Sequence, residues 1–174
     1  MTIRKILTEP DTFLRQKSVE VDKVDDNTRS LMNDMLETMY AAPGIGLAAI
    51  QVGVPKRIIV IDLSRSNENK NPLYFINPKI INNSNINASY EEGCLSVPGQ
   101  FAEISRPDKC KVKYLDYNGN EQIIDAEGLL ATCLQHEIDH LEGILFIDYL
   151  SKLKKNMIVK KLSKHKKSLE RIVV

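Results

Sequence analysis

The sequence predicts an α+β fold in which short, mostly antiparallel sheets surround a central helix, with a further helix at the C-terminal end. Short strand-like runs dominate the middle of the chain, and they do not alternate regularly with helices as in a βαβ protein. The 174 residues are 43% hydrophobic and 27% charged, which is typical of one ordinary globular domain. No apolar run approaches the roughly 18 residues of a membrane span, so we expect a cytoplasmic protein.

Helical patterns come first along the chain. Residues 11–16 can form a short helical turn, and residues 25–40 carry apolar side chains at helical spacing. Asp25 or Asp26 supplies the N-cap of this helix, and Pro43-Gly44 ends it.

Strands are expected in the middle of the chain. Residues 57–62 and 73–77 are rich in apolar and β-branched side chains, which favours strands. Residues 111–117 and 121–125 flank an Asn-Gly-Asn turn at 118–120. This arrangement predicts a hairpin, because Asn and Gly tolerate the positive φ of a tight turn.

Two more helices are expected towards the end. Residues 128–142 form the central helix, with Gly143 as its stop, and residues 151–168 form the last one. By contrast, residues 64–87 are rich in Asn and Ser and are interpreted as a surface loop around short strands.

The net charge of +1 hides a segregation of charge along the chain. Residues 1–150 hold 15 Lys or Arg against 22 Asp or Glu, whereas residues 151–174 hold nine against one. We expect residues 1–150 to form a catalytic domain and residues 151–174 to be a basic C-terminal helix of the same domain. That helix carries an apolar stripe of Leu153, Met157, Leu162 and Leu169, which we expect to pack on the body of the protein. Its cationic outer face is either solvated or docks on RNA.

The strongest chemical signal is an H-E-x-x-H motif on the predicted central helix. His136 and His140 lie four residues apart, so their imidazoles share one helix face and can hold the same metal ion. Glu137 lies beside the first histidine, where it can act as a general base on a water molecule. The motif predicts a metal-dependent hydrolase.

The third metal ligand is less clear from spacing alone. Phe146 stands where the metzincin pattern needs a histidine, which excludes that class, and His165 lies within a lysine cluster. Cys133 shares the face of His136 but lies about 10.5 Å along the helix axis from His140. Cys94, in a glycine-containing turn, is the better candidate, although a buried structural thiol remains the alternative.

A third segment, residues 44–51, superficially matches a dinucleotide-binding fingerprint. The match fails because a helix precedes it and Gly53 and Pro55 follow it, whereas the fingerprint follows a strand and opens a helix. We expect its glycines to let the backbone pass close to a substrate, with Gln51 offering a side-chain amide.

Taken together, these segments resemble the bacterial type of the peptide deformylase family. The family motifs G-apolar-G-apolar-A-A-x-Q, E-G-C-apolar-S and Q-H-E-x-D-H-L-x-G are intact at residues 44–51, 92–96 and 135–143. The resemblance extends from about Ile6 to Tyr149. It implies hydrolysis of the N-formyl group from the N-formylmethionine of newly made polypeptides, with release of formate.

The resemblance also implies roles for individual residues. One divalent metal would be held by Cys94, His136 and His140, and Glu137 would be the acid and base. The Leu95 backbone amide and the Gln51 side chain would stabilise the developing oxyanion. The methionine side chain and the adjoining backbone would be received by a pocket of five residues: Gly44, Ile45, Gly46, Leu129 and Cys133.

The implied cofactor is Fe(II), replaceable by Zn, Ni or Co, and the implied partners are N-formylmethionyl nascent peptides, with the ribosome as a further partner of the basic helix. We expect no membrane and no DNA partner, and a monomer. One departure concerns Phe101, where many bacterial relatives have Arg, which affects how the peptide is contacted beyond its first residues. Arg106 resembles the family's other basic position and can pair with Glu92.

Two alternative functions remain open at this point. A zinc endopeptidase could use the same histidine pair with a distant carboxylate, such as Glu170, as third ligand. A metal-stabilised RNA-binding protein could use the Cys and His residues structurally and bind through the basic helix.

Overall fold

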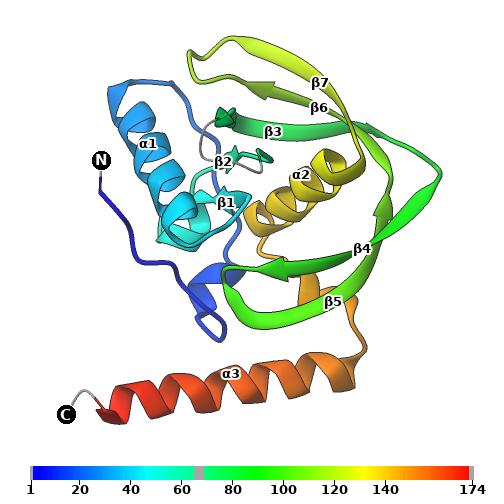
Figure 1. Ribbon diagram of the computed structural model, residues 1–174. Helices are drawn as coiled ribbons and strands as arrows, with labels where there is room; N and C mark the ends of the chain where they lie inside the picture. Colours follow the sequence, from blue (N-terminus) through cyan, green and yellow to red (C-terminus); the bar gives the residue numbers. More distant parts are fainter. Residues whose placement is uncertain (1, 65–68, 173–174) are drawn as a thin grey trace.

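The computed structural model describes residues 2–64 and 69–172, except for the side chains at 167 and 169–172. Strands form two antiparallel sheets (Figure 1). The larger sheet has the strand order β1 (Gly46–Ala48), β2 (Ile58–Ile61), β3 (Leu73–Asn83), β6 (Lys109–Leu115) and β7 (Glu121–Glu127). The smaller sheet pairs β4 (Asn87–Cys94) with β5 (Val97–Pro107). The α+β class with antiparallel sheets is confirmed.

Helix α2 (Gly128–Leu141) lies between the two sheets, and α1 (Asp26–Ala41) covers the other face of the larger sheet (Figure 1). The alternation of strand side chains explains these layers. In β2, Ile59 and Ile61 pack in the cluster of α2, whereas Ile58 and Val60 pack in the cluster of α1. The strand is therefore apolar throughout because both of its faces are buried.

The expected helix ends are confirmed. Asp25 caps α1, since its side chain accepts a hydrogen bond from the Thr28 amide. Gly143 follows α2 with a φ of 75°. A Cβ at this position would collide with the carbonyl oxygen of Arg15, so the turn requires glycine. The expected turn at 11–16 is a short 3-10 helix, η1 (Thr12–Arg15).

The interpretation of residues 64–87 as loop was wrong for much of its length. Strand β3 continues to Asn83 through register shifts near Ile76 and Ile80, and the hairpin of β4 and β5 then begins at Asn87. Asn77 has a φ of 51°, which accompanies the first irregularity. The irregular register interrupts the alternation that would have marked one long strand.

The last helix, α3 (Lys152–Ile172), runs beneath the smaller sheet (Figure 1). Leu162 is buried, and it packs with Ile158 and Val159 against residues of β5 and of the 3-10 helix η4 (Phe146–Tyr149). The expected apolar stripe was wrong in its first half, because Leu153 and Met157 are 72% and 63% exposed. The side chain of Leu169, the last residue of the expected stripe, lies outside the described residues. Within the described part of the chain, no helix is long and apolar enough to cross a membrane.

Candidate metal centre and active site

Three potential metal ligands converge between α2 and the end of β4. His136 and His140 are buried, with ring centroids 5.0 Å apart. Cys94 Sγ lies 3.2 Å from His140 Nε2. One donor atom from each of the three residues lies within 4.8 Å of the other two. A thiolate with two imidazoles is a donor set that suits a divalent transition metal, so these residues fit such an ion.

A network of charged side chains orients the first histidine. Glu92 Oε2 lies 2.8 Å from His136 Nδ1, which leaves Nε2 of this ring for the site. Both carboxylate oxygens of Glu92 accept hydrogen bonds from Arg106, Oε1 at 2.6 Å and Oε2 at 3.1 Å, and Arg106 also donates to Asp139 at 2.7 Å. Burial alone would raise the pKa of Glu92, but hydrogen bonds from His136 and Arg106 outweigh it and lower the pKa. The expected pairing of Arg106 with Glu92 is present.

Glu137 follows His136 on α2 and lies close to Gly46 of β1. It is 4% exposed, and burial raises its pKa to about 7. Its Oε2 atom has no hydrogen-bond partner among the described residues. A Cβ at Gly46 would lie 2.5 Å from Glu137 Oε1, so β1 approaches this carboxylate as closely as only glycine allows. The carboxylate can hold or release a proton near neutral pH.

Gln51 reaches the site from the 3-10 helix η2 (Ala49–Val52). Its Oε1 accepts a hydrogen bond from the Ala48 amide, which directs Nε2 towards Ser96 Oγ at 3.1 Å and Cys94 Sγ at 3.6 Å. The buried Ser96 also donates its backbone amide to Cys94 Sγ at 3.4 Å. The sequence pattern gave no role to Ser96, although its place two residues after the motif cysteine was a usable signal.

A cavity of about 490 Å³ opens onto these groups. It is lined by ten of the predicted site residues: Gly44, Ile45, Gly46, Gln51, Cys94, Leu95, Leu129, Cys133, His136 and Glu137. His140 is the eleventh and lies buried beneath the lining, beside Cys94. The structure therefore brings all predicted site residues together. The lining also contains Tyr90, Glu91 and Thr132, which the sequence pattern did not mark.

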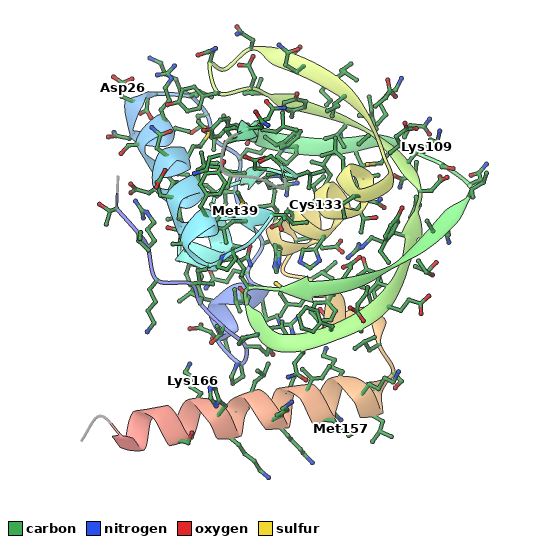
Figure 2. All side chains as sticks on the ribbon, viewed as in Figure 1. Asp26, Met39, Lys109, Cys133, Met157 and Lys166 are labelled. Carbon is green, nitrogen blue, oxygen red and sulfur yellow. The ribbon has the colours of Figure 1, made fainter. Side chains whose placement is uncertain are left out.

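Cys133 lies in the middle of α2 (Figure 2). Burial raises its pKa well above that of an ordinary thiol, so it remains a neutral, apolar wall of the cavity.

The remaining cysteine, Cys110, is buried in the core cluster around α2 and is not among the residues that line the cavity. Phe146 stacks on His136 with ring centroids 6.2 Å apart, and His165 is exposed on α3. The side chain of Glu170 lies outside the described residues.

Comparisons with known proteins agree with this geometry. The family model described as "Polypeptide deformylase" matches residues 3–156. A peptide deformylase of Pelagibacter ubique is 66% identical over the full length of both chains, and one of Phenylobacterium zucineum is 60% identical over 97% of this chain and 99% of its own. The crystal structure of peptide deformylase from Ehrlichia chaffeensis in complex with actinonin superposes with a TM-score of 0.91 at 51% identity, covering 95% of this chain and 98% of that one. The chain therefore belongs to the polypeptide deformylase family, metal-dependent hydrolases that remove N-formyl groups.

Proposed function

We propose that this chain hydrolyses the formyl group of N-formylmethionyl peptides at a metal centre formed by Cys94, His136 and His140. The observation that carries the proposal is the convergence of these three donors within 4.8 Å of one another, beside a buried carboxylate whose pKa is about 7. A divalent ion bound there supplies Lewis acidity and lowers the pKa of water. We propose Fe(II) as the physiological ion, with Zn, Ni or Co as substitutes, because a mixed thiolate and imidazole set accepts each of them.

Glu137 moves the proton. Its buried carboxylate accepts a proton from the attacking water and then donates it to the amine that leaves as the formyl C–N bond breaks. A pKa of about 7 suits both directions of transfer near neutral pH. The missing side chain of Gly46 leaves the room that this carboxylate occupies beside β1.

Gln51 and Leu95 stabilise the charge that develops on the formyl oxygen. The Gln51 amide is fixed in place by its bond to Ala48, and its Nε2 donor is directed towards Cys94. Leu95 follows Cys94 in the turn between β4 and β5, where its backbone amide is the second donor. Donors fixed before the reaction begins stabilise an oxyanion without reorganisation.

The substrate lies between two strand edges. β1 is the terminal strand of the larger sheet, and β4 belongs to a sheet of two strands, so each has an edge that is unpaired within the described sheets. Residues from both strands line the cavity. An extended peptide can pair with such edges, while its methionine side chain contacts Ile45, Leu129 and Cys133.

The basic helix α3 belongs to the same domain as the metal centre and is the proposed contact with the ribosome. We place residues 151–174 in the same domain as residues 1–150, because Leu162 is buried in a cluster with residues of β5 and η4. Exposed lysines on α3 favour a contact with ribosomal RNA. We further propose that the protein is a monomer in the bacterial cytoplasm, where its nascent-peptide substrate emerges from the ribosome.

Formate release from formyl-Met-Ala-Ser by anaerobically purified protein tests the activity. We expect Glu137→Gln to keep the metal and lose activity by at least about 100-fold. Cys94→Ala is expected to lose both the bound metal and the activity. His165→Ala removes an exposed histidine outside the site and is expected to keep both. Formate release that is absent from the wild type, or equal in Glu137→Gln, would contradict the proposal. Internal cleavage of an unformylated peptide would instead support an endopeptidase, and RNA binding without either activity would support the binding protein.

A further inference from the structure

An exposed aromatic side chain stands at the mouth of the cavity. Phe101 of β5 is 66% exposed and lines the cavity. It pairs directly across the strands with Gly93, and its ring covers that glycine so closely that a Cβ there would lie 2.5 Å from Cε1. An aromatic ring over a cross-strand glycine is held in place by the bare backbone. Phe101 is therefore an ordered wall over Gly93 that solvent reaches.

Two carboxylates flank this ring on the same face of the hairpin. Glu91 and Glu103 are direct partners across β4 and β5, next to the pair of Gly93 and Phe101. Residues two apart on a strand share a face, so both acids lie on the side of Phe101. Like charges directly opposite each other are unfavourable, and no salt bridge to either acid occurs among the described side chains.

The other hairpin of the protein shows the contrast. There, three acids of β7 each form a salt bridge with a lysine of β6: Lys109 with Glu127, Lys111 with Asp125, and Lys113 with Glu121. Among the residues that the structure describes, none of those lining the cavity is Lys or Arg. The mouth of the cavity is thus an apolar surface beside uncompensated negative charge.

The alternation of side chains along the bound peptide determines which substrate residue contacts the surface formed by Phe101 and Glu91. The methionine side chain, in the proposed function on which this inference rests, points towards Leu129 and Cys133 of α2. The face of β4 that carries Glu92 points the same way, since Glu92 contacts His136. Side chains alternate along an extended strand, so the residue after methionine points to the opposite side, where Glu91 and Phe101 lie.

We propose that Phe101 and Glu91 form a subsite that favours Lys or Arg as the second residue of the formylated peptide. The aliphatic stem of such a residue lies on the ring, and its charge compensates the two carboxylates. Acidic second residues meet repulsion at the same place. An Arg at position 101 would reverse the sign of this subsite.

Three peptides test the subsite: formyl-Met-Lys-Ser, formyl-Met-Glu-Ser and formyl-Met-Ala-Ser. At low ionic strength we expect kcat/KM for the Lys peptide to exceed that for the Glu peptide by about threefold to tenfold, and the ratio to shrink in about 0.5 M salt. Phe101→Arg should bring the ratio to one or below, and Glu91→Gln should reduce it. Ile123→Arg adds the same charge at a similarly exposed apolar position on β7, and should leave the ratio and the Ala peptide unchanged.

The outcomes separate the two proposals. A wild-type ratio of one at low salt, or equal shifts in Phe101→Arg and Ile123→Arg, overturns the subsite while formate release still supports the deformylase function. Absence of formate from all three peptides overturns the proposed function itself. Glu91→Gln keeps the test informative if Phe101→Arg does not fold, with Glu20→Gln as its control, since Glu20 is also exposed and lies outside the cavity lining.

Discussion

Glu92 Oε2 lies 2.8 Å from His136 Nδ1, and this contact joins the inner face of β4 to the helix that carries both histidines. We expect Glu92→Gln to lower metal affinity by about tenfold to 100-fold, because the carboxylate fixes the tautomer and orientation of the ring. Competition with a chelator measures this affinity. Glu91→Gln removes the neighbouring exposed carboxylate and should not change it, so equal effects of the two variants would argue against orientation by Glu92.

Gly46→Ala should reduce kcat more than it reduces stability. The added Cβ would lie 2.5 Å from Glu137 Oε1 and 2.9 Å from Cys133 Sγ, so the carboxylate must shift. A shift of this kind misplaces the proton acceptor, and a loss of about 100-fold in kcat is expected. Steady-state kinetics and thermal unfolding of the same samples compare the two effects. Gly99→Ala, where a Cβ meets open space, is a control for added volume, although its φ of 66° adds strain.

Removal of the metal should lower Tm. Cys94 lies on the hairpin of β4 and β5 whereas both histidines lie on α2, so an ion that binds only the folded arrangement stabilises it by mass action. Unfolding with and without chelator measures the difference. In Cys94→Ala, the chelator is expected to have little effect, and an undiminished effect in that variant would place the stabilising ion elsewhere.

Asp34 should contribute to acid sensitivity. A hydrogen bond from the Thr2 amide, together with Arg4, holds the pKa of this carboxyl below its ordinary value of 3.8. A carboxyl with a lowered pKa in the folded state stabilises the protein above its unfolded pKa, and this contribution disappears as pH falls through the folded pKa. Asp34→Asn should therefore flatten the loss of stability as pH falls below the ordinary carboxyl pKa of 3.8. Chemical unfolding at several pH values checks this against Asp26→Asn, which changes an exposed carboxyl of the same helix.

Leu162 should anchor α3. Leu162→Ala removes a buried side chain from the cluster with Phe146 and Val97, and a loss of about 2–4 kcal/mol in unfolding free energy is expected. Leu153→Ala changes the same residue type at a 72% exposed position and should cost little. If the two variants unfold alike in denaturant, α3 does not contribute to the cooperative core.

The sequence pattern predicted α2 and its chemistry because spacing on a helix determines which side chains share a face. It did not predict the hairpin of β4 and β5, and the reason is physical. Glu92 and Arg106 point inwards to meet His136 and Asp139, so charged residues stand at positions where a half-buried strand normally carries apolar ones. Their mutual pairing, which makes burial tolerable, becomes visible only when the strands are side by side.

Cys94 and His140 are 46 residues apart in sequence, yet their side-chain atoms lie within 3.2 Å. Strands β5, β6 and β7 all lie between them in the chain and belong to two different sheets. Closing a loop of this length costs chain entropy that no contact within α2 alone repays. The donor set therefore exists only while the hairpin of β4 and β5 is packed on α2, which makes metal binding a report on long-range packing and not on the helix by itself.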